Sequence, residues 1–254
     1  MSEDLQALKE TFTRRRGHWH PFDEVLLKLD PAFLKSYFEM NQAPFVTQGL
    51  SRKVREFVYI AIDASVDHMY QPGLQRHIDY ALRFGATPQE VLEVIQICCS
   101  LAGHSHAMGM AILADELARR GKGVEPVKLN AEQAAVRDAF EKHVGYWPQW
   151  GDLLFALAPR FAEGLLGVLS RPWESGPLEP KVKEFVYIGL NAAPTTLNAE
   201  AVRFHVGRAL DFGATAQEVS EVLQLSTALT VHSCTIGLPS LENSMRCMDM
   251  WPQE

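Results

Sequence analysis

The stretch HIDYALRFGATPQEVLEVIQ at residues 77–96 decides the fold, because it returns without a gap as HVGRALDFGATAQEVSEVLQ at residues 205–224. The offset is 205 − 77 = 128 residues, and the same offset aligns residues 53–110 with residues 181–238. Between those two segments, 25 of 58 positions are identical by direct count. Similarity at one fixed offset over this length indicates a tandem duplication of one structural unit.

The duplication also predicts where the domains begin and end. Identical residues continue upstream at the same offset, as with Trp19 and Trp147. Residues 119–126, RRGKGVEP, are charged and contain glycine and proline, which is typical of a linker. We therefore expect a first domain at residues 1–126 and a second at residues 127–254.

Helix signals surround the repeated stretch. Residues 87–90, TPQE, have the composition of a capping box with proline at the first helical position, and residues 215–218, TAQE, repeat it. Gly85 precedes the first box and supplies the left-handed residue that often ends a helix. The apolar residues that follow recur at helical spacing, and no useful length shows strand-like alternation. The predicted fold class is all-α.

Composition places the chain among globular proteins, with 47% apolar and 22% charged residues. The net charge of −7 argues against a nucleic-acid partner. No uninterrupted apolar stretch approaches the roughly 18 residues of a membrane span, so no membrane partner is expected either. The acidic start is unlike a signal peptide, and the four cysteines form no CxxC pair. These features predict a reducing, cytoplasmic setting.

Comparison of the two copies separates polar residues that have changed from those that have not. Surface positions differ freely, for example Arg83 against Asp211. Once capping residues are set aside, the retained polar pairs that stand out are Glu56/Glu184, His77/His205, Gln96/Gln224, His104/His232 and Ser105/Ser233. These residues are the candidates for chemistry.

His77 is expected near the start of its helix, after a turn at residues 70–73. The positive end of a helix disfavours a second proton on imidazole, and a neutral imidazole in an apolar cleft suits acid–base catalysis. Glu56 could pair with this histidine and set its tautomer, and His205 and Glu184 repeat the arrangement. Two plainer interpretations remain open: a core histidine bonded to the main chain, and a glutamate favoured by the helix dipole.

His104 and His106 follow the apolar helix and, with His77, suggest a three-histidine metal site. However, His106 becomes Cys234 in the second copy, and a His-x-His pair at a helix end has little specificity. The sequence favours a different role for His104 and His232, namely lining a ligand pocket, so no metal is assigned.

The two copies also differ in ways that predict a division of labour. Three side chains able to bind a ligand occur only in the first copy: His68, Tyr70 and His106. Their counterparts are Thr196, Asn198 and Cys234. We therefore expect the chemistry in the first copy, with these three residues helping to bind substrate, and a scaffolding role for the second copy.

The arrangement of Glu56, His77 and the run ALRFGATPQEVLEV at residues 81–94 resembles the carboxymuconolactone decarboxylase family, whose superfamily also contains the alkylhydroperoxidase D proteins. The resemblance covers about residues 31–112 and 159–240. It implies a compact helical unit that normally assembles into rings. Two fused units then imply an intramolecular pseudo-dimer, and a homo-oligomer such as a trimer of these chains.

Within that superfamily the resemblance is closer to the decarboxylase branch. The peroxidase branch uses a CxxC pair before its histidine, whereas residues 67–77 and 195–205 contain no cysteine. Without a thiolate nucleophile, thiol peroxidase activity is not expected. A Tyr-x-Gly-x-Pro segment common in the decarboxylase branch is replaced by LAGHS at residues 101–105, so the lactone substrate itself is not carried over.

These observations favour a cofactor-independent lyase acting on a small carboxylated or lactone-like metabolite. His77, and secondarily its repeat His205, would donate a proton to the enolate left by loss of CO2, while Glu56 and Glu184 would orient the histidines. Two alternatives are a metal-dependent enzyme that uses clustered histidines and a non-catalytic protein that binds a small ligand or serves assembly.

Overall fold

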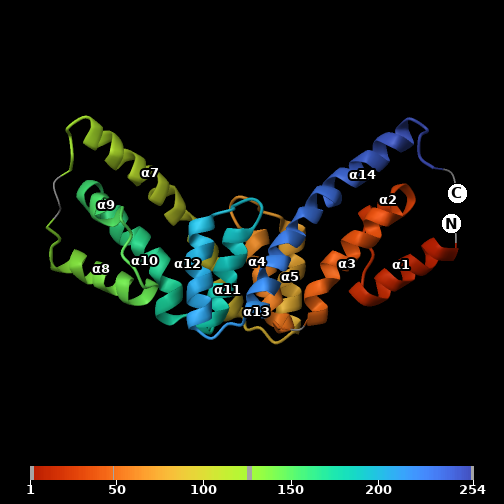
Figure 1. Ribbon diagram of the computed structural model, residues 1–254, viewed down its shortest axis with the longest axis horizontal. Helices are drawn as coiled ribbons and strands as arrows, with labels where there is room; N and C mark the ends of the chain where they lie inside the picture. The colour runs from red at the N-terminus through yellow and green to blue at the C-terminus, as the bar shows by residue number, and fades with distance from the viewer. Residues whose placement is uncertain (1–2, 48, 125–127, 253–254) are drawn as a thin grey trace.

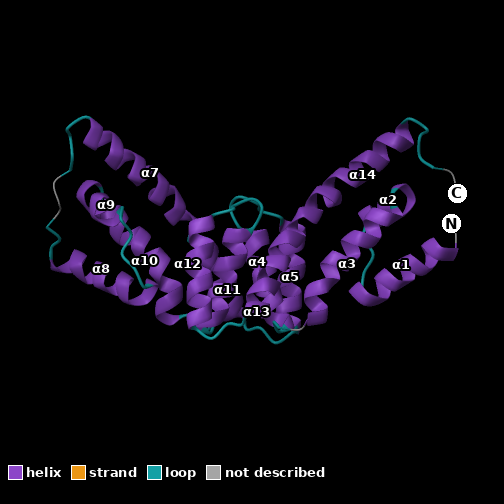
Figure 2. Ribbon diagram, in the orientation of Figure 1, coloured by secondary structure: helices purple, strands orange, loops and turns teal. Residues whose placement is uncertain are grey.

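The computed structural model describes residues 3–47, 49–124 and 128–252. Within those ranges the chain forms α-helices joined by short loops, with one 3-10 turn at Leu229–Val231 and no strand (Figure 2). The predicted all-α class is therefore confirmed.

Equivalent helices follow one another in the same order in both copies. The first copy contains α1 (Glu3–Arg16), α2 (Pro21–Leu29), α3 (Pro31–Thr47), α4 (Arg52–Ala64), α5 (Gln71–Arg83), α6 (Pro88–Cys98) and α7 (Leu101–Arg119). The second copy contains α8 (Ala131–Val144), α9 (Gly151–Leu157), α10 (Pro159–Ser175), α11 (Pro180–Ala192), α12 (Ala199–Asp211), α13 (Ala216–Ala228) and α14 (His232–Cys247). Both expected capping boxes form, with Thr87 and Thr215 as the capping residues.

The helices are arranged as a central bundle with a lobe on each side (Figure 1). The bundle contains α4, α5 and α6 together with their counterparts α11, α12 and α13. One lobe contains α1, α2, α3 and α14, and the other contains α7, α8, α9 and α10. The last helix of each copy therefore lies in the lobe of the other copy.

This exchange is fixed by apolar packing. Leu238 of α14 packs against the first-copy cluster that contains Phe38, and Met110 of α7 packs against the second-copy cluster that contains Phe140. The predicted boundary between residues 126 and 127 falls within residues 125–127, which lie outside the described residues. The division into domains at that point stays a prediction.

The central bundle has a core to which both copies contribute. Val58 and Ile62 of α4 lie in one buried cluster with Phe185 and Ile188 of α11. Full burial of such a side chain stabilises the fold by about 1.5–3 kcal/mol. Since much of each copy's apolar surface is covered by the other copy, the two form the expected intramolecular pseudo-dimer.

Two buried ion pairs tie the copies together at equivalent places. Lys183 Nζ lies 2.8 Å from Glu93 Oε1, and Arg55 Nη2 lies 3.4 Å from Glu221 Oε2. Each carboxylate also accepts a hydrogen bond from a backbone N–H of the other copy. These four side chains are almost completely buried, so the charges depend on each other for stabilisation.

One apolar run was not anticipated from the sequence. Residues 88–119 contain a stretch that is long and apolar enough to cross a membrane by length and composition, with a mean hydropathy of 1.3 over an 18-residue window. The structure divides this run at Cys99 and Ser100 into α6 and α7. Because α6 buries Val94 and Ile97 in the bundle, core packing accounts for the apolar character of its first part.

Candidate functional site

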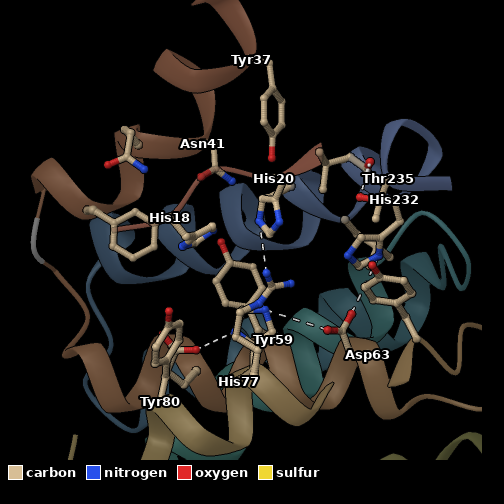
Figure 3. A pocket seen from close by; sticks show the side chains of 18 of the residues that line it. His18, His20, Tyr37, Asn41, Tyr59, Asp63, His77, Tyr80, His232 and Thr235 are labelled. Atoms are coloured by element: carbon tan, nitrogen blue, oxygen red, sulfur yellow. Dashed lines mark hydrogen bonds and ion pairs between the residues drawn. The ribbon is translucent and has the colours of Figure 1, made fainter. Parts of the chain in front are cut away.

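A cavity of about 410 Å³ lies where α4 and α5 of the first copy meet α14 of the second copy (Figure 3). Cavities of this size accommodate small-molecule ligands. Charged, neutral polar and aromatic side chains from both copies face it, including His18, His20, Tyr37, Asn41, Tyr59, Asp63, His77, Tyr80, His232 and Thr235. We refer to it as the first cavity.

The predicted pair of Glu56 and His77 forms in the wall of the first cavity. Glu56 on α4 accepts a hydrogen bond from His77 Nδ1 on α5, with 2.6 Å between the nitrogen and Oε2. The imidazole also stacks on Tyr59, with ring centroids 4.5 Å apart. Because the carboxylate holds the Nδ1 proton, Nε2 is the nitrogen left to exchange a proton with a ligand. His77 is therefore bonded to a carboxylate, whereas the plainer interpretation had a core histidine bonded to the main chain.

Asp63 is a site residue that sequence reasoning did not single out. It lies two helical turns after Glu56 on α4, and its Oδ2 is 3.9 Å from His77 Nε2. Burial raises the pKa of Asp63 to about 6, although the charges of His77 and Arg76 act in the opposite direction. The only sequence signal was a difference between the copies, since Asn191 occupies the equivalent position.

Three of the predicted binding residues meet beside Asp63. His68 Nε2 and His232 Nδ1 are hydrogen-bonded at 2.8 Å, and the ring of Tyr70 lies 3.9 Å from that of His232. Burial is the main cause that lowers the pKa of His232, to about 4, and nearby His68 and His77 act in the same direction. His232 is therefore a neutral imidazole near neutral pH.

Sequence reasoning also missed a basic group near the pair of Glu56 and His77, which we call the dyad. Arg76 directly precedes His77 on α5, and its Nη1 donates to His20 Nε2 at 3.1 Å. A guanidinium of this kind can bind a carboxylate with two parallel hydrogen bonds. Comparison of the copies could not identify these residues, because Phe204 and Pro148 replace them in the second copy.

The second copy has its own cavity of about 880 Å³, which we call the second cavity. His205 in its wall donates from Nδ1 to Glu184 Oε2 at 2.7 Å and stacks on Tyr187. Here, however, the other oxygen of Glu184 accepts a hydrogen bond from Arg208, which also donates to the carbonyl of Val144. This carboxylate is therefore shared between an imidazole and a guanidinium.

The three-histidine metal site suggested by the sequence is wrong, because its members lie apart. His77 lines the first cavity, whereas His104 lines the second cavity beside His205. His106 contributes to neither lining and stacks on Phe161, with ring centroids 5.0 Å apart. The physical reason is that α7 carries both of its histidines into the lobe of the second copy.

His104 is nevertheless equivalent to His232, because each reaches the cavity of the other copy. Burial is the main cause that lowers the pKa of His104, and His205 adds to the effect. The thiol of Cys98 takes no part in either cavity: it donates to the Ala61 carbonyl in the core, and burial raises its pKa to about 12.

Comparisons with known proteins agree with this architecture. A sequence model of the carboxymuconolactone decarboxylase family matches residues 31–116 and 159–231, one segment in each copy. A search of curated proteins gave no match. A crystal structure from Burkholderia xenovorans LB400, described as a candidate gamma-carboxymuconolactone decarboxylase subunit, is similar with a TM-score of 0.88 and 31% sequence identity. The similarity covers 98% of this chain and 100% of that chain. The chain belongs to the carboxymuconolactone decarboxylase family.

Proposed function

We propose that the protein is a lyase that removes CO2 from a small carboxylated metabolite in the first cavity. The observation that carries the proposal is the hydrogen-bonded pair of Glu56 and His77, which lines a cavity that also contains Arg76 and His20. Membership of the decarboxylase family supports the reaction class.

The proposed reaction divides into binding, bond cleavage and proton transfer. Arg76 binds a carboxylate of the substrate. The substrate also carries a carbonyl group conjugated with the carbon that bears the departing carboxylate. When the C–C bond to that carboxylate breaks, CO2 leaves and the electron pair moves toward the carbonyl, which leaves an enolate. His77 then gives the proton on Nε2 to carbon, and the Glu56 carboxylate stabilises the imidazolium until that transfer is complete.

The substrate class follows from the size and polarity of the first cavity. A volume of about 410 Å³ admits a compact metabolite, and its basic groups favour an anion. Since the similar crystal structure is described as a candidate gamma-carboxymuconolactone decarboxylase subunit, carboxylated lactones head the set of compounds to test. β-Keto acids of similar size complete it, because their decarboxylation also passes through an enolate.

The test is CO2 release by the purified protein from that panel, followed in D2O by NMR. We expect at least one compound to lose CO2 and to gain one deuteron at the enolate carbon that His77 protonates. A variant with both His77→Ala and His205→Ala should lose this activity. Undiminished turnover by the folded double variant would rule out histidine acid–base chemistry in either cavity.

We also propose that the chain assembles into a homo-oligomer. Met108 and Leu113 on α7 are exposed, as are their counterparts Ile236 and Leu241 on α14. Exposed apolar side chains at matching places on two lobes are typical of an interface between subunits. Light scattering after size exclusion should give a multiple of the 28.5 kDa chain mass, such as three. A monomer at micromolar concentration contradicts this proposal.

A cytoplasmic setting remains part of the proposal. All four cysteines are free, which is consistent with a reducing compartment.

A further inference from the structure

We propose that Asp63, His68 and His232 form a binding site for a divalent transition-metal ion such as Zn²⁺ or Fe²⁺. One ligand atom from each of the three lies within 4.8 Å of the other two. The separations are 2.8 Å between His68 Nε2 and His232 Nδ1, 3.7 Å from His68 Nε2 to Asp63 Oδ1, and 4.0 Å from His232 Nδ1 to Asp63 Oδ1.

These distances fit a metal site that is slightly open. Tetrahedral ligands at roughly 2.0–2.1 Å from a zinc ion lie about 3.3–3.4 Å from one another. The observed separations bracket that spacing, so small side-chain rotations would close the site. Two imidazoles and one carboxylate are also a recognised ligand set for iron and zinc, with further positions left for water or substrate.

The carboxylate of Asp63 provides a second, independent observation. The side chain is almost fully buried, and Oδ2 has no hydrogen-bond partner. A buried carboxylate oxygen without a donor is costly unless a cation offsets its charge. His77 Nε2 is near, but its distance of 3.9 Å is too long for a hydrogen bond. A bound cation would offset this charge.

The backbone beside Asp63 is adapted to this carboxylate. A Cβ atom on Gly73 would lie 2.1 Å from Asp63 Oδ2, so any side chain there would displace the aspartate. The second copy has Ala201 at the equivalent position and Asn191 in place of the aspartate. Glycine and aspartate thus occur together in the copy that contributes Asp63 and His68 to the cluster.

The second cavity is an internal control for the proposal. The positions equivalent to the three ligands are occupied by Asn191, Thr196 and His104, which provide one imidazole and no carboxylate. Among the described residues, Asp63, His68 and His232 are the one group of at least three His, Cys, Asp or Glu side chains with metal-binding spacing. The proposal therefore predicts one metal ion per chain, located beside His77, and replaces the earlier expectation of no metal.

The site does not depend on the proposed lyase activity. A chain that binds the ion and releases no CO2 from any compound still supports the metal site, whereas a chain that releases CO2 without binding the ion overturns it. If both proposals hold, the ion lies close enough to His77 to bind a carboxylate or enolate oxygen of the same substrate.

The test uses full-length protein without a histidine tag, stripped with chelator and titrated with Zn²⁺ by calorimetry, with Co²⁺ absorption as a second signal. We expect one ion per chain. Asp63→Asn and His232→Ala should each raise Kd by about 100-fold or more, because a three-ligand site loses one ligand. His68→Thr should do the same; like Asp63→Asn, it introduces the residue that the second copy already contains at the equivalent place.

The matched controls are His104→Ala, the counterpart of His232→Ala, and His106→Ala, which removes a histidine outside both cavities. Both controls should bind one ion with the affinity of the unchanged protein. Less than stoichiometric binding by the unchanged protein overturns the proposal, as does equal loss of affinity in His104→Ala and His232→Ala. Circular dichroism verifies that each variant is folded.

Discussion

Replacing His77 with alanine is expected to lower kcat for CO2 release by about 10²–10⁴-fold, the usual contribution of a positioned acid–base group. The imidazole is the group that Glu56 orients toward the first cavity, and alanine can neither hold nor transfer the proton. Arg76 and the cavity walls remain, so substrate binding should change much less than turnover. Steady-state kinetics on a compound that the unchanged protein decarboxylates would separate these two effects.

His205→Ala is the matched control for this prediction. Its imidazole bonds to Glu184 and stacks on Tyr187, as His77 does with the equivalent residues of the first copy, so the two variants should lose similar stability. In the second cavity, however, Arg208 binds the same glutamate, and no counterpart of Asp63 is present. We expect His205→Ala to retain most of the activity. An equal loss in both single variants would contradict the assignment of chemistry to the first cavity.

The sequence predicts the dyad because both of its members lie on strongly periodic helices. Glu56 and His77 are 21 residues apart, and their repeats Glu184 and His205 keep that spacing and contact. Helix packing brings α4 against α5 within one copy, as the local pattern suggests. A retained polar pair on adjacent helices is therefore accessible to reasoning from a single sequence.

The cavity that His232 lines, and several other residues of the first cavity, could not be predicted in the same way. His232 reaches it because α14 crosses into the lobe of the other copy, and no local pattern records such a long-range exchange. His20 lies just before α2, and Arg76 has no basic counterpart at the equivalent place. The duplication identifies what both copies share, whereas Asp63 and Arg76 are informative because the copies differ.

The buried ion pairs between the copies also could not be predicted from the sequence. Glu93 and Glu221 occupy equivalent positions in the periodic helices α6 and α13, which suggests an ordinary helix face. Their partners Lys183 and Arg55 belong to the opposite copies, so the ion pairs exist only once the pseudo-dimer has formed. Removal of one partner should therefore destabilise the whole central bundle.

Glu221→Ala is expected to lower the free energy of unfolding at pH 7 by about 3–5 kcal/mol, the typical cost of leaving a buried charge unpaired. The carboxylate accepts hydrogen bonds from the backbone of Gly49 at 2.6 Å and Leu50 at 2.9 Å, and it faces Arg55. Urea unfolding followed by circular dichroism measures the change. Glu116→Ala removes only solvent-exposed ion pairs and should cost less than about 1 kcal/mol.

The pH dependence provides a sharper test of the same carboxylate. Burial alone would raise the pKa of Glu221, but hydrogen bonds from Thr47 and the backbone, with the charge of Arg55, outweigh burial and hold the pKa below its ordinary value of 4.5. A depressed carboxyl pKa stabilises the fold fully above the unfolded-state pKa and progressively less as pH falls through the folded-state pKa. The stability difference between the unchanged protein and Glu221→Ala should therefore be constant from pH 6 to pH 8 and shrink below about pH 4.5. A difference that stayed constant into acid would show that packing, and not the charge of Glu221, holds the two copies together at this point.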